Sequence, residues 1–272
     1  MIIKNEFPIL ERSTESHAVI NPQASGETFP RLCVIAFFEE AIAAVIQKHE
    51  SRKIGTYPSE MKEFNVYQLK YYGTELCVIQ AVVASGSIAM MVDWLYGKGI
   101  EIILCCGGCG VLDDIPAGDV ILPVRALRDE GASYKYLSAS RFIELQAWPI
   151  KAIKKVLEQH KIRYIECTTW STDGFYRETR EMIEYRKAEG CKVVEMECAT
   201  VAAVAQYRNK GFGQVLYSGD MLSGSEPYND RGWYCNFSAR EKLLWIAMEA
   251  LRLLLAYGRA IRTFRIKQRL KC

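Results

Sequence analysis

Apolar runs that alternate with amphipathic segments are the feature that most limits what this chain can fold into. The runs that look like strands are LCVIAFF, VYQLKYY, LCVIQAVVA, EIILCCGG, DVILPVRAL, RYIECTTWST and QVLYSGD. Nearly unbroken apolar strands are typical of sheets that are covered on both faces. Several of the intervening segments end in a glycine, as helices often do. The pattern therefore predicts an α/β fold, with a mixed central sheet flanked by helices.

The segments between these runs have the hydrophobic spacing of helices. They cover residues 39–50, 87–99, 148–161, 178–190 and 197–211, and a longer C-terminal helix is expected at about 239–265. The chain has 272 residues, enough for one full α/β core, and shows no internal repeat or low-complexity linker. We expect a single domain over residues 1–272.

Charge and hydropathy exclude some classes of partner. The net charge is +3, and most of the basic excess lies in the last stretch, GRAIRTFRIKQRLKC, which we interpret as the solvated end of a helix. Such an excess does not indicate nucleic acid as a partner. The apolar run LLWIAMEALRLLLAYG is interrupted by Glu249 and Arg252, so no membrane span is expected. The N-terminal MIIKNEFPILERS does not have the form of a signal peptide.

Ten cysteines without a secretion signal indicate free thiols in a reducing compartment, so we expect a cytoplasmic protein. The spacing Cys106-Gly-Gly-Cys109 is that of a redox pair, but such a pair needs a helix that starts at its first cysteine. Here a strand leads into the motif. The three histidines are scattered, so the second close pair that a zinc site needs is missing. We expect buried thiols and no metal.

Four short stretches follow or close the expected strands: CCGGCG, STDGFY, VVEMEC and YSGD. Ligands of open α/β sheets bind beyond the carboxyl ends of the strands, so these stretches could meet at one rim. Glu195-Met196-Glu197 stands where an alternating strand turns into an alanine-rich helix. Taken alone, acids in this position could also simply complement the helix dipole.

These stretches, in this order and spacing, resemble the nucleoside phosphorylase/nucleosidase family, which includes uridine phosphorylases, purine nucleoside phosphorylases and adenosylhomocysteine-type nucleosidases. The resemblance covers roughly residues 17–220. It is strongest from EFNVYQLKYYGTELCVI through GIEIILCCGGCGVL and IPAGDVILPVRALRDEGAS to VVEMECATVAAVA. It implies the phosphorylase/hydrolase-like fold, with a partly closed mixed sheet, and an enzyme that cleaves the N-glycosidic bond of a small-molecule nucleoside.

The resemblance assigns Glu197 to the ribose. The second glutamate of the family's Glu-Met-Glu signature holds the 2′ and 3′ hydroxyls, and a carboxylate has two acceptor oxygens that suit a cis-diol. Met196 would lie under the sugar as a soft apolar surface. Glu197 would also counter the positive charge that grows on the ribose as the bond breaks. Glu195 is left as a supporting residue.

Asp220, at the end of YSGD, matches the aspartate that protonates the departing purine in purine-cleaving members. Gly219 stands where the family usually has serine, and a loop aspartate that caps the next turn is the alternative. Phe175 would stack on the base. Thr179 and Glu181 occupy the positions of the glutamine and arginine that read pyrimidines, so the resemblance leans toward a purine.

The phosphate site departs from the family pattern. Phosphorylases carry a Gly-Asp-Pro-x-x-Arg loop after the first strand, but this chain reads Ala-Phe-Phe-Glu-Glu-Ala there. Cys105 replaces an arginine on the strand before the glycine loop. Lys62 matches in kind a cation that a neighbouring subunit lends, and the expected loop around Gly107 and Gly108 offers backbone N–H groups to an anion. The expected reaction is phosphorolysis, with inorganic phosphate as co-substrate and no cofactor.

Two other functions stay open. The stretch IAFFEEA also resembles the nucleosidase loop whose last glutamate activates water, and this places Glu40 in that role; an acid-rich helix start is the simpler interpretation. A non-catalytic nucleoside-binding protein is the second alternative. The family implies a homo-oligomer, a dimer or a trimer of dimers, in which a histidine reaches the neighbouring ribose 5′ hydroxyl. His17 is the candidate for that histidine, although a plain surface histidine fits equally well.

Overall fold

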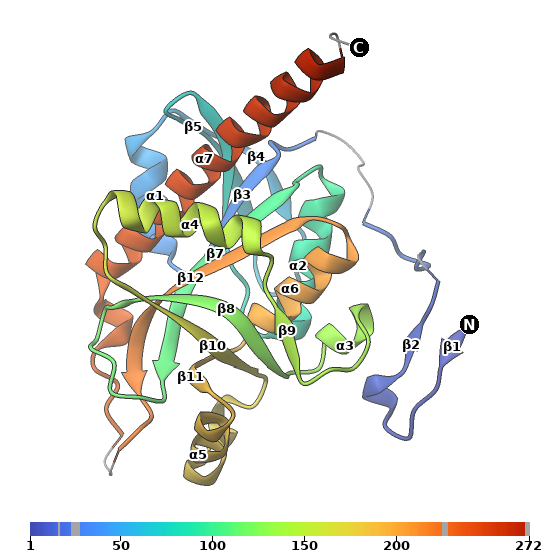
Figure 1. The fold of residues 1–272 in the computed structure, drawn as a ribbon, viewed down its shortest axis with the longest axis vertical. Coiled ribbons are helices and arrows are strands. Elements are labelled where there is room, and N and C mark those ends of the chain that lie inside the picture. The colour runs from blue at the N-terminus through green and yellow to red at the C-terminus, as the bar shows by residue number, and fades with distance from the viewer. Residues whose placement is uncertain (16, 23–27, 225–227, 270–272) are drawn as a thin grey trace.

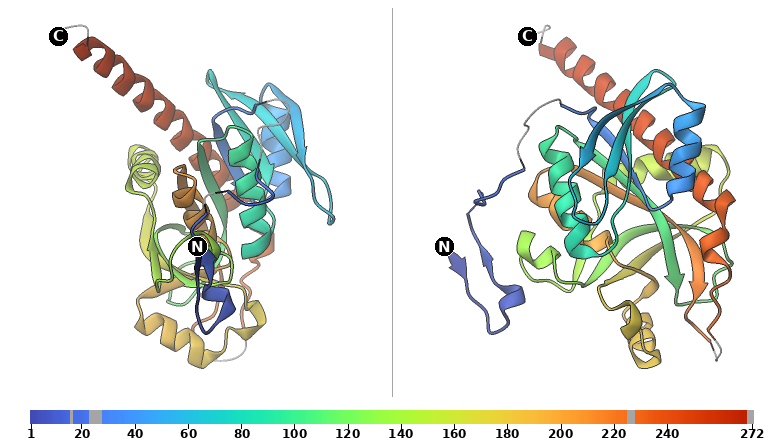
Figure 2. Two further views of the ribbon diagram at one scale, coloured as in Figure 1. Left: turned by 90° about the vertical axis from the view of Figure 1, so that its right-hand side faces the viewer. Right: turned by 180° about the vertical axis from the view of Figure 1, so that it is seen from behind.

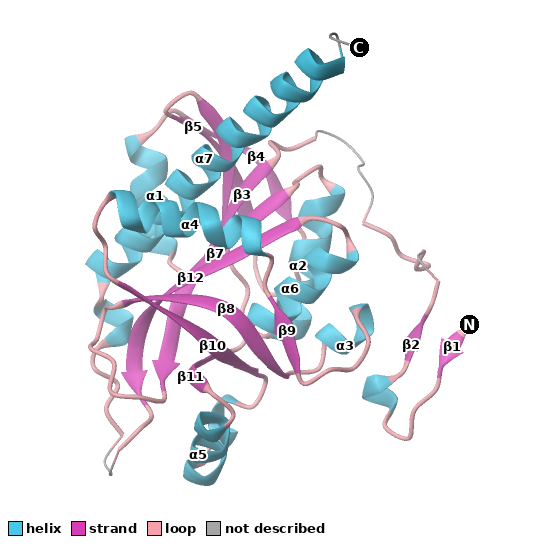
Figure 3. Ribbon diagram, viewed as in Figure 1, coloured by secondary structure: helices cyan, strands magenta, loops and turns pink. Residues whose placement is uncertain are grey.

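In the computed structural model, one large sheet forms the centre of the molecule and helices lie on both sides of it (Figure 1). The structure describes residues 1–15, 17–22, 28–224 and 228–269, with residues 256–269 as backbone only. Figure 3 separates the strands of this sheet from the helices that flank it. The sheet contains ten strands in the order β11-β10-β8-β12-β7-β3-β6-β5-β4, and β9 pairs with β8.

The strands are β3 (Leu32–Ala36), β4 (Ser51–Tyr57), β5 (Phe64–Tyr71), β6 (Thr74–Gln80), β7 (Ile102–Val111), β8 (Val120–Asp129), β9 (Phe142–Glu144), β10 (Tyr164–Thr172), β11 (Cys191–Glu195) and β12 (Gly211–Met221). Strand β11 pairs in parallel with β10 and antiparallel with β7. Strands β7, β12, β8, β10 and β11 therefore form a closed ring, and β3 to β6 extend the sheet beyond it. The expected mixed and partly closed sheet is confirmed.

The helices are α1 (Glu39–Lys48), α2 (Ser85–Gly97), α3 (Ser133–Tyr136), α4 (Ala147–Gln159), α5 (Arg180–Ala188), α6 (Cys198–Tyr207) and α7 (Phe237–Arg269). Helix α2 packs against α6, and α4 packs against α7. A small hairpin of β1 (Ile2–Ile3) and β2 (Arg12–Ser13) lies beside the body of the molecule. The end of α7 projects away from that body, as the turned views show (Figure 2).

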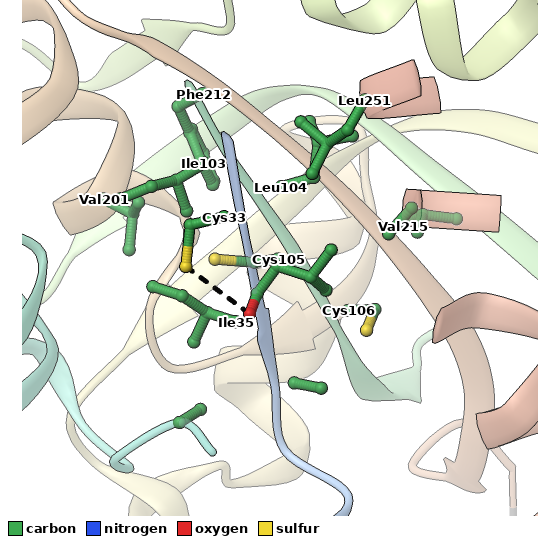
Figure 4. Close-up of a cluster of buried hydrophobic side chains, with 14 of the residues drawn as sticks. Cys33, Ile35, Ile103, Leu104, Cys105, Cys106, Val201, Phe212, Val215 and Leu251 are labelled. Atoms are coloured by element: carbon green, nitrogen blue, oxygen red, sulfur yellow. Dashed lines mark hydrogen bonds between the residues drawn. The ribbon is translucent and has the colours of Figure 1, made fainter. Parts of the chain in front are cut away.

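The core explains why the central strands are apolar on both faces. All five residues of β3 are buried. Figure 4 shows side chains of β3, β7 and β12 together with Val201 of α6 and Leu251 of α7 in one buried cluster. Cysteines take part in this packing as small apolar residues: Cys33, Cys105 and Cys106 are all buried there.

Several elements differ from the expectation, and the short β1, β2, α3 and β9 were not expected at all. The stretch around Gly107 and Gly108 is not a loop, because β7 continues to Val111 and both glycines pair with β12. Strand β4 was not expected, since its SRKIGTY sequence is polar; it lies at the end of the strand order, where β5 is its one partner among the described strands. Helix α7 starts at Phe237 and continues to Arg269, so it is longer than expected. Within the described residues, no helix is long and apolar enough to span a membrane.

Candidate active site

A cavity of about 460 Å³ lies at the ends of β7, β11 and β12. It brings together side chains from all four stretches that the sequence places at one rim. Its walls also include the residues that follow β3 and the first turn of α7. The side chains of Phe38, Phe175, Glu178, Glu197, Asp220 and Arg240 are among those that line it.

Glu195 closes β11 and caps helix α6. Its carboxylate accepts hydrogen bonds from the backbone N–H groups of Glu197 (2.8 Å) and Cys198 (2.6 Å), and from the hydroxyls of Thr169 (3.2 Å) and Ser171. The first N–H groups of a helix have no partner within the helix, so a carboxylate here satisfies them. This arrangement fits the supporting role expected for Glu195.

Glu197 lines the cavity as the residue that precedes α6, and it is buried. Burial raises the pKa of its carboxyl group to about 8, and the neighbouring Glu195 adds to the shift. One carboxylate oxygen accepts a hydrogen bond from the backbone N–H of Ala84 at 2.7 Å. Met196 lines the same cavity.

The backbone that holds Glu197 is itself fixed. Ala84 has a φ of 76°, a conformation that costs an alanine free energy, and α2 begins directly after it. Asp173 anchors this junction, because its carboxylate accepts hydrogen bonds from the Ser85 hydroxyl (2.7 Å) and the Gly131 N–H (2.9 Å). The Ala84 N–H that binds Glu197 therefore belongs to a junction that Asp173, from a separate segment, holds in place.

Asp220 lies near the end of β12 and lines the cavity, where the Tyr228 hydroxyl donates a hydrogen bond to it at 2.8 Å. The preceding Gly219 fits its surroundings better than a serine would. A Cβ there would lie 3.1 Å from the carbonyl oxygen of Cys109 and 3.2 Å from the Cβ of Trp233. The Arg231 side chain also donates to the Gly219 carbonyl oxygen.

Phe175 lines the cavity from a short 3₁₀ turn, Phe175–Arg177, and is half exposed. The adjacent Glu178 also lines the cavity and was not expected from the sequence. Burial and the nearby Asp220 raise the pKa of Glu178 to about 7. Its place after STDGFYR was the only sequence signal, and the resemblance to pyrimidine-specific members directed attention to Thr179 and Glu181 instead.

Arg240, in the first turn of α7, is the second cavity residue that sequence reasoning missed. Its guanidinium group lies over the ring of Phe38 at 5.2 Å from the centroid and forms an ion pair with Glu40 at 2.7 Å. The sequence carries no local signal for this role, because Glu40 and Arg240 are 200 positions apart.

Of the remaining candidates, Glu40, Lys62, His17 and Gly107 are not among the residues that line the cavity. Glu40 points to Arg240 and is not among the described lining residues. Lys62 bonds to Gln80 at 2.7 Å and lies 3.6 Å from Glu39. His17 is exposed, and Gly107 is covered by neighbouring side chains, whereas Gly108 does line the cavity.

The cysteines of CCGGCG belong to a strand. Cys105, Cys106 and Cys109 are buried in β7, and burial raises the pKa of each thiol. No helix starts at Cys106, so the arrangement required for a redox pair is missing. Within the part of the chain that the structure describes, no group of three His, Cys, Asp or Glu side chains is placed to hold a metal ion.

Comparisons with known proteins place this architecture in a family. Residues 31–240 match the family model of the phosphorylase superfamily. A guanosine phosphorylase from Halorubrum lacusprofundi is 27% identical over 178 residues, which cover 63% of this chain and 72% of that protein.

Solved structures share the fold. A purine nucleoside phosphorylase from Toxoplasma gondii superposes with a TM-score of 0.73 at 17% identity, covering 88% of this chain and 97% of that one. An AMP nucleosidase from Bacteroides thetaiotaomicron gives a TM-score of 0.69 at 19% identity, covering 85% and 91%. The family match includes all the residues that line the cavity, from those after β3 to Arg240 in the first turn of α7. The chain belongs to the phosphorylase superfamily.

Proposed function

We propose that the protein is a nucleoside phosphorylase that cleaves a purine nucleoside with inorganic phosphate, giving the free base and ribose 1-phosphate. The observation that carries this proposal is that Glu197, Asp220 and Phe175 line one cavity of about 460 Å³. They represent a sugar ligand, a proton donor and an aromatic surface for the base. Membership of the phosphorylase superfamily supports the same reaction.

In this reaction a phosphate oxygen forms a bond to the anomeric carbon of the ribose while the bond from that carbon to the base nitrogen breaks. The electron pair of the broken bond stays on the base, and Asp220 supplies the proton that neutralises it. Glu197 accepts hydrogen bonds from the ribose hydroxyls. Because hydroxyl donors favour the charged form of a carboxyl group, sugar binding should lower the pKa of Glu197 from about 8.

The ionised Glu197 then lies beside the ribose as positive charge develops on it. Its burial makes this effective, since charges interact more strongly where water is excluded. Met196 gives the sugar an apolar contact from the same segment. We propose Glu195 as the residue that orients Glu197, because it binds the Glu197 backbone N–H.

Hydrolysis by a water that Glu40 activates is the second candidate. The observation that favours it is the absence of a phosphate-binding arginine loop after β3, where Ala36, Phe37 and Phe38 lead directly into α1. The ion pair with Arg240 would then hold the Glu40 carboxylate in place.

We also propose a homo-oligomer, a dimer or a trimer of dimers, in which Lys62 and His17 act in the site of a neighbouring copy. Both lie outside the cavity walls of their own chain, so an action within that chain is not supported. Lys62 would bring positive charge to phosphate, and His17 would reach the 5′ hydroxyl of the ribose.

A nucleoside panel with and without phosphate tests the proposal. Purine nucleosides should release free base only when phosphate is present, and ribose 1-phosphate should form in equal amount. Release of free ribose at the same rate without phosphate would establish the hydrolytic candidate instead. Tight nucleoside binding without release of any base, under both conditions, would identify a binding protein.

A further inference from the structure

We infer that Arg240 binds the phosphate co-substrate, and that Glu40 is the counter-ion which the phosphate displaces. This inference rests on the proposed phosphorolysis. It assigns the anion site to a side chain of α7, whereas the sequence pattern directs attention to Lys62 and to the glycines of β7.

The position of Arg240 is the first argument. Its guanidinium group lines the cavity and lies over Phe38, in the segment between β3 and α1. This is the segment in which the resemblance leads one to expect a phosphate loop, and its own sequence carries no cation. Helix α7 thus brings a cation from a distant part of the chain to the place where the loop lacks one.

The charges of the cavity give the second argument. Among its described lining residues Arg240 is the one basic side chain, whereas Glu178, Glu195, Glu197 and Asp220 are acidic. A phosphate dianion can enter such a cavity only beside a strong positive charge. Cys105 cannot supply one, because a thiol is neutral and its thiolate is negative; burial raises the pKa of this thiol and so keeps it from adding a negative charge.

The hydrogen bonds of Arg240 give the third argument. A guanidinium group has five N–H donors. Among the described residues, Nε donates to the Tyr217 hydroxyl (3.4 Å), Nη2 to the carbonyl oxygen of Trp233 (3.3 Å) and Nη1 to Glu40 (2.7 Å). Two donors, one on each terminal nitrogen, remain for an anion, and loss of Glu40 would release a third.

The pair with Glu40 is exchangeable. The Arg240 side chain is 11% exposed, but that of Glu40 is 41% exposed, so the carboxylate can turn into water when another anion arrives. Ion pairs of this kind contribute little free energy. Phosphate presents more acceptor oxygens than a carboxylate and suits the planar guanidinium group. Lys62 of a neighbouring copy would add to this charge without replacing it.

Titration of the full-length protein with inorganic phosphate, followed by calorimetry, tests the inference without depending on turnover. Arg240→Gln should weaken phosphate binding about 10- to 100-fold, the effect of losing hydrogen bonds to a charged group. Arg240→Lys should restore part of the affinity. Arg31→Gln is the matched control, because Arg31 forms a guanidinium–carboxylate pair with Glu101 and does not line the active-site cavity, and this variant should bind phosphate there as the wild type does.

Glu40→Gln should change the affinity for phosphate in the opposite direction to Arg240→Gln. Removing the competing carboxylate should tighten phosphate binding roughly 1.5- to 5-fold, which corresponds to the free energy of an exposed ion pair. The KM for phosphate should follow the binding constants, with little change in the KM for the nucleoside. Thermal unfolding of each variant checks that the fold is intact.

The outcomes separate this inference from the proposed function. Phosphate-dependent base release that is unchanged in Arg240→Gln would overturn the inference and leave the proposed function in place. Phosphate binding that is lost in Arg240→Gln, in a protein that cleaves no nucleoside, would support the anion site and remove the proposed function. Wild-type protein that binds no phosphate, or loss of phosphate-independent cleavage in Glu40→Gln, would overturn the inference.

Discussion

Glu197 shows how a single buried side chain links function to stability. An unfolded chain exposes this carboxyl group to water, where its pKa is about 4.3. Burial beside Glu195 raises the pKa to about 8 in the folded protein. Between these values the folded state binds more protons than the unfolded state, so the stability contributed by this group falls as the pH rises from about 4.3 to about 8.

We therefore expect Glu197→Gln to be more stable than the wild type at pH 8.5, by on the order of 1–3 kcal/mol, because glutamine carries no charge to bury. Near pH 5 the difference should become small. Chemical unfolding at both pH values measures it. An identical pH dependence of stability in the two proteins would contradict the assigned burial of the charge.

Although Glu197→Gln should raise stability at pH 8.5, it should lower turnover. We expect Glu197→Gln and Asp220→Asn each to lower kcat about 100- to 1,000-fold, since one group that stabilises charge in a transition state contributes about 2.7–4 kcal/mol. Both variants keep the shape of the side chain, so circular dichroism should be unchanged. Steady-state kinetics on the best substrate of the panel gives the measurement. Rates near that of the wild type in both variants would remove these residues from the site.

The sequence allowed part of the site to be predicted at the residue scale. Glu195, Met196, Glu197, Phe175 and Asp220 were all expected, because each belongs to a local motif, and all five line the cavity. Their roles stay predictions. Glu178 and Arg240 were missed for physical reasons. Glu178 lies in the cavity because it follows a short 3₁₀ turn. Arg240 lies on α7, and its ion-pair partner Glu40 is distant in the sequence.

At the scale of one element, strand β7 connects the strands that form the site. It pairs with β3 over Ile102–Cys106 and, near its end, with β12 and β11, so that end joins the two walls of the cavity that β12 and β11 contribute. Gly110 pairs with Val194 of β11 near that end. A Cβ at this position would lie 2.8 Å from a methyl carbon of Leu222, 3.0 Å from one of Val194 and 3.3 Å from a carboxylate oxygen of Asp220.

Gly110→Ala should therefore displace the neighbouring side chains, including Asp220. Overpacking of this kind costs about 1–3 kcal/mol of stability, and we expect kcat to fall as well. Gly86→Ala is the control, because a Cβ placed there, in the first turn of α2, meets no atom within 4 Å apart from its chain neighbours and the backbone of its own helix. Alanine should be neutral at that position or stabilising by up to about 1 kcal/mol. Equal melting temperatures and rates for the two variants would contradict the packing argument.

Element prediction succeeded where the hydrophobic pattern was strong. The central strands and most helices were expected within a few residues, because burial on both faces leaves unbroken apolar runs. It failed at Gly107 to Gly110, where the glycines indicated a loop. These residues stay in a strand because β12 and β11 supply backbone partners that the local sequence cannot reveal. Strand β4 was missed because its residues are mostly polar and because, within the residues that the structure describes, it pairs with β5 alone at the edge of the sheet.

At the scale of the whole molecule, the proposed oligomer makes a prediction about shared sites. Lys62→Ala and Glu197→Gln should each be weakly active alone at limiting phosphate, because each lacks one component. If copies exchange on mixing, some mixed oligomers will contain sites with both native residues. For randomly mixed dimers, activity should return to about a quarter of the wild-type value.

Light scattering on the separate and mixed proteins supplies the control, since it reports whether oligomers form at all. Activity of the mixture no greater than the sum of its parts would show that Lys62 does not act across a subunit boundary. A monomer with full activity would exclude shared sites altogether.

The closed ring of strands could be expected only through the family resemblance, because the β11–β7 pairing joins segments that no local pattern connects.

The burial of most described thiols allows one cysteine to be labelled selectively. Of the described cysteines, eight are buried and Cys235 is exposed. The buried thiols will react slowly, because thiolates are the reactive form. In a Cys272→Ser background, a maleimide dye would therefore attach mainly at Cys235, in the 3₁₀ turn Trp233–Cys235 that precedes α7. Since Trp233 and Arg240 both line the cavity, the fluorescence of this dye would report ligand entry in real time, without any need for turnover.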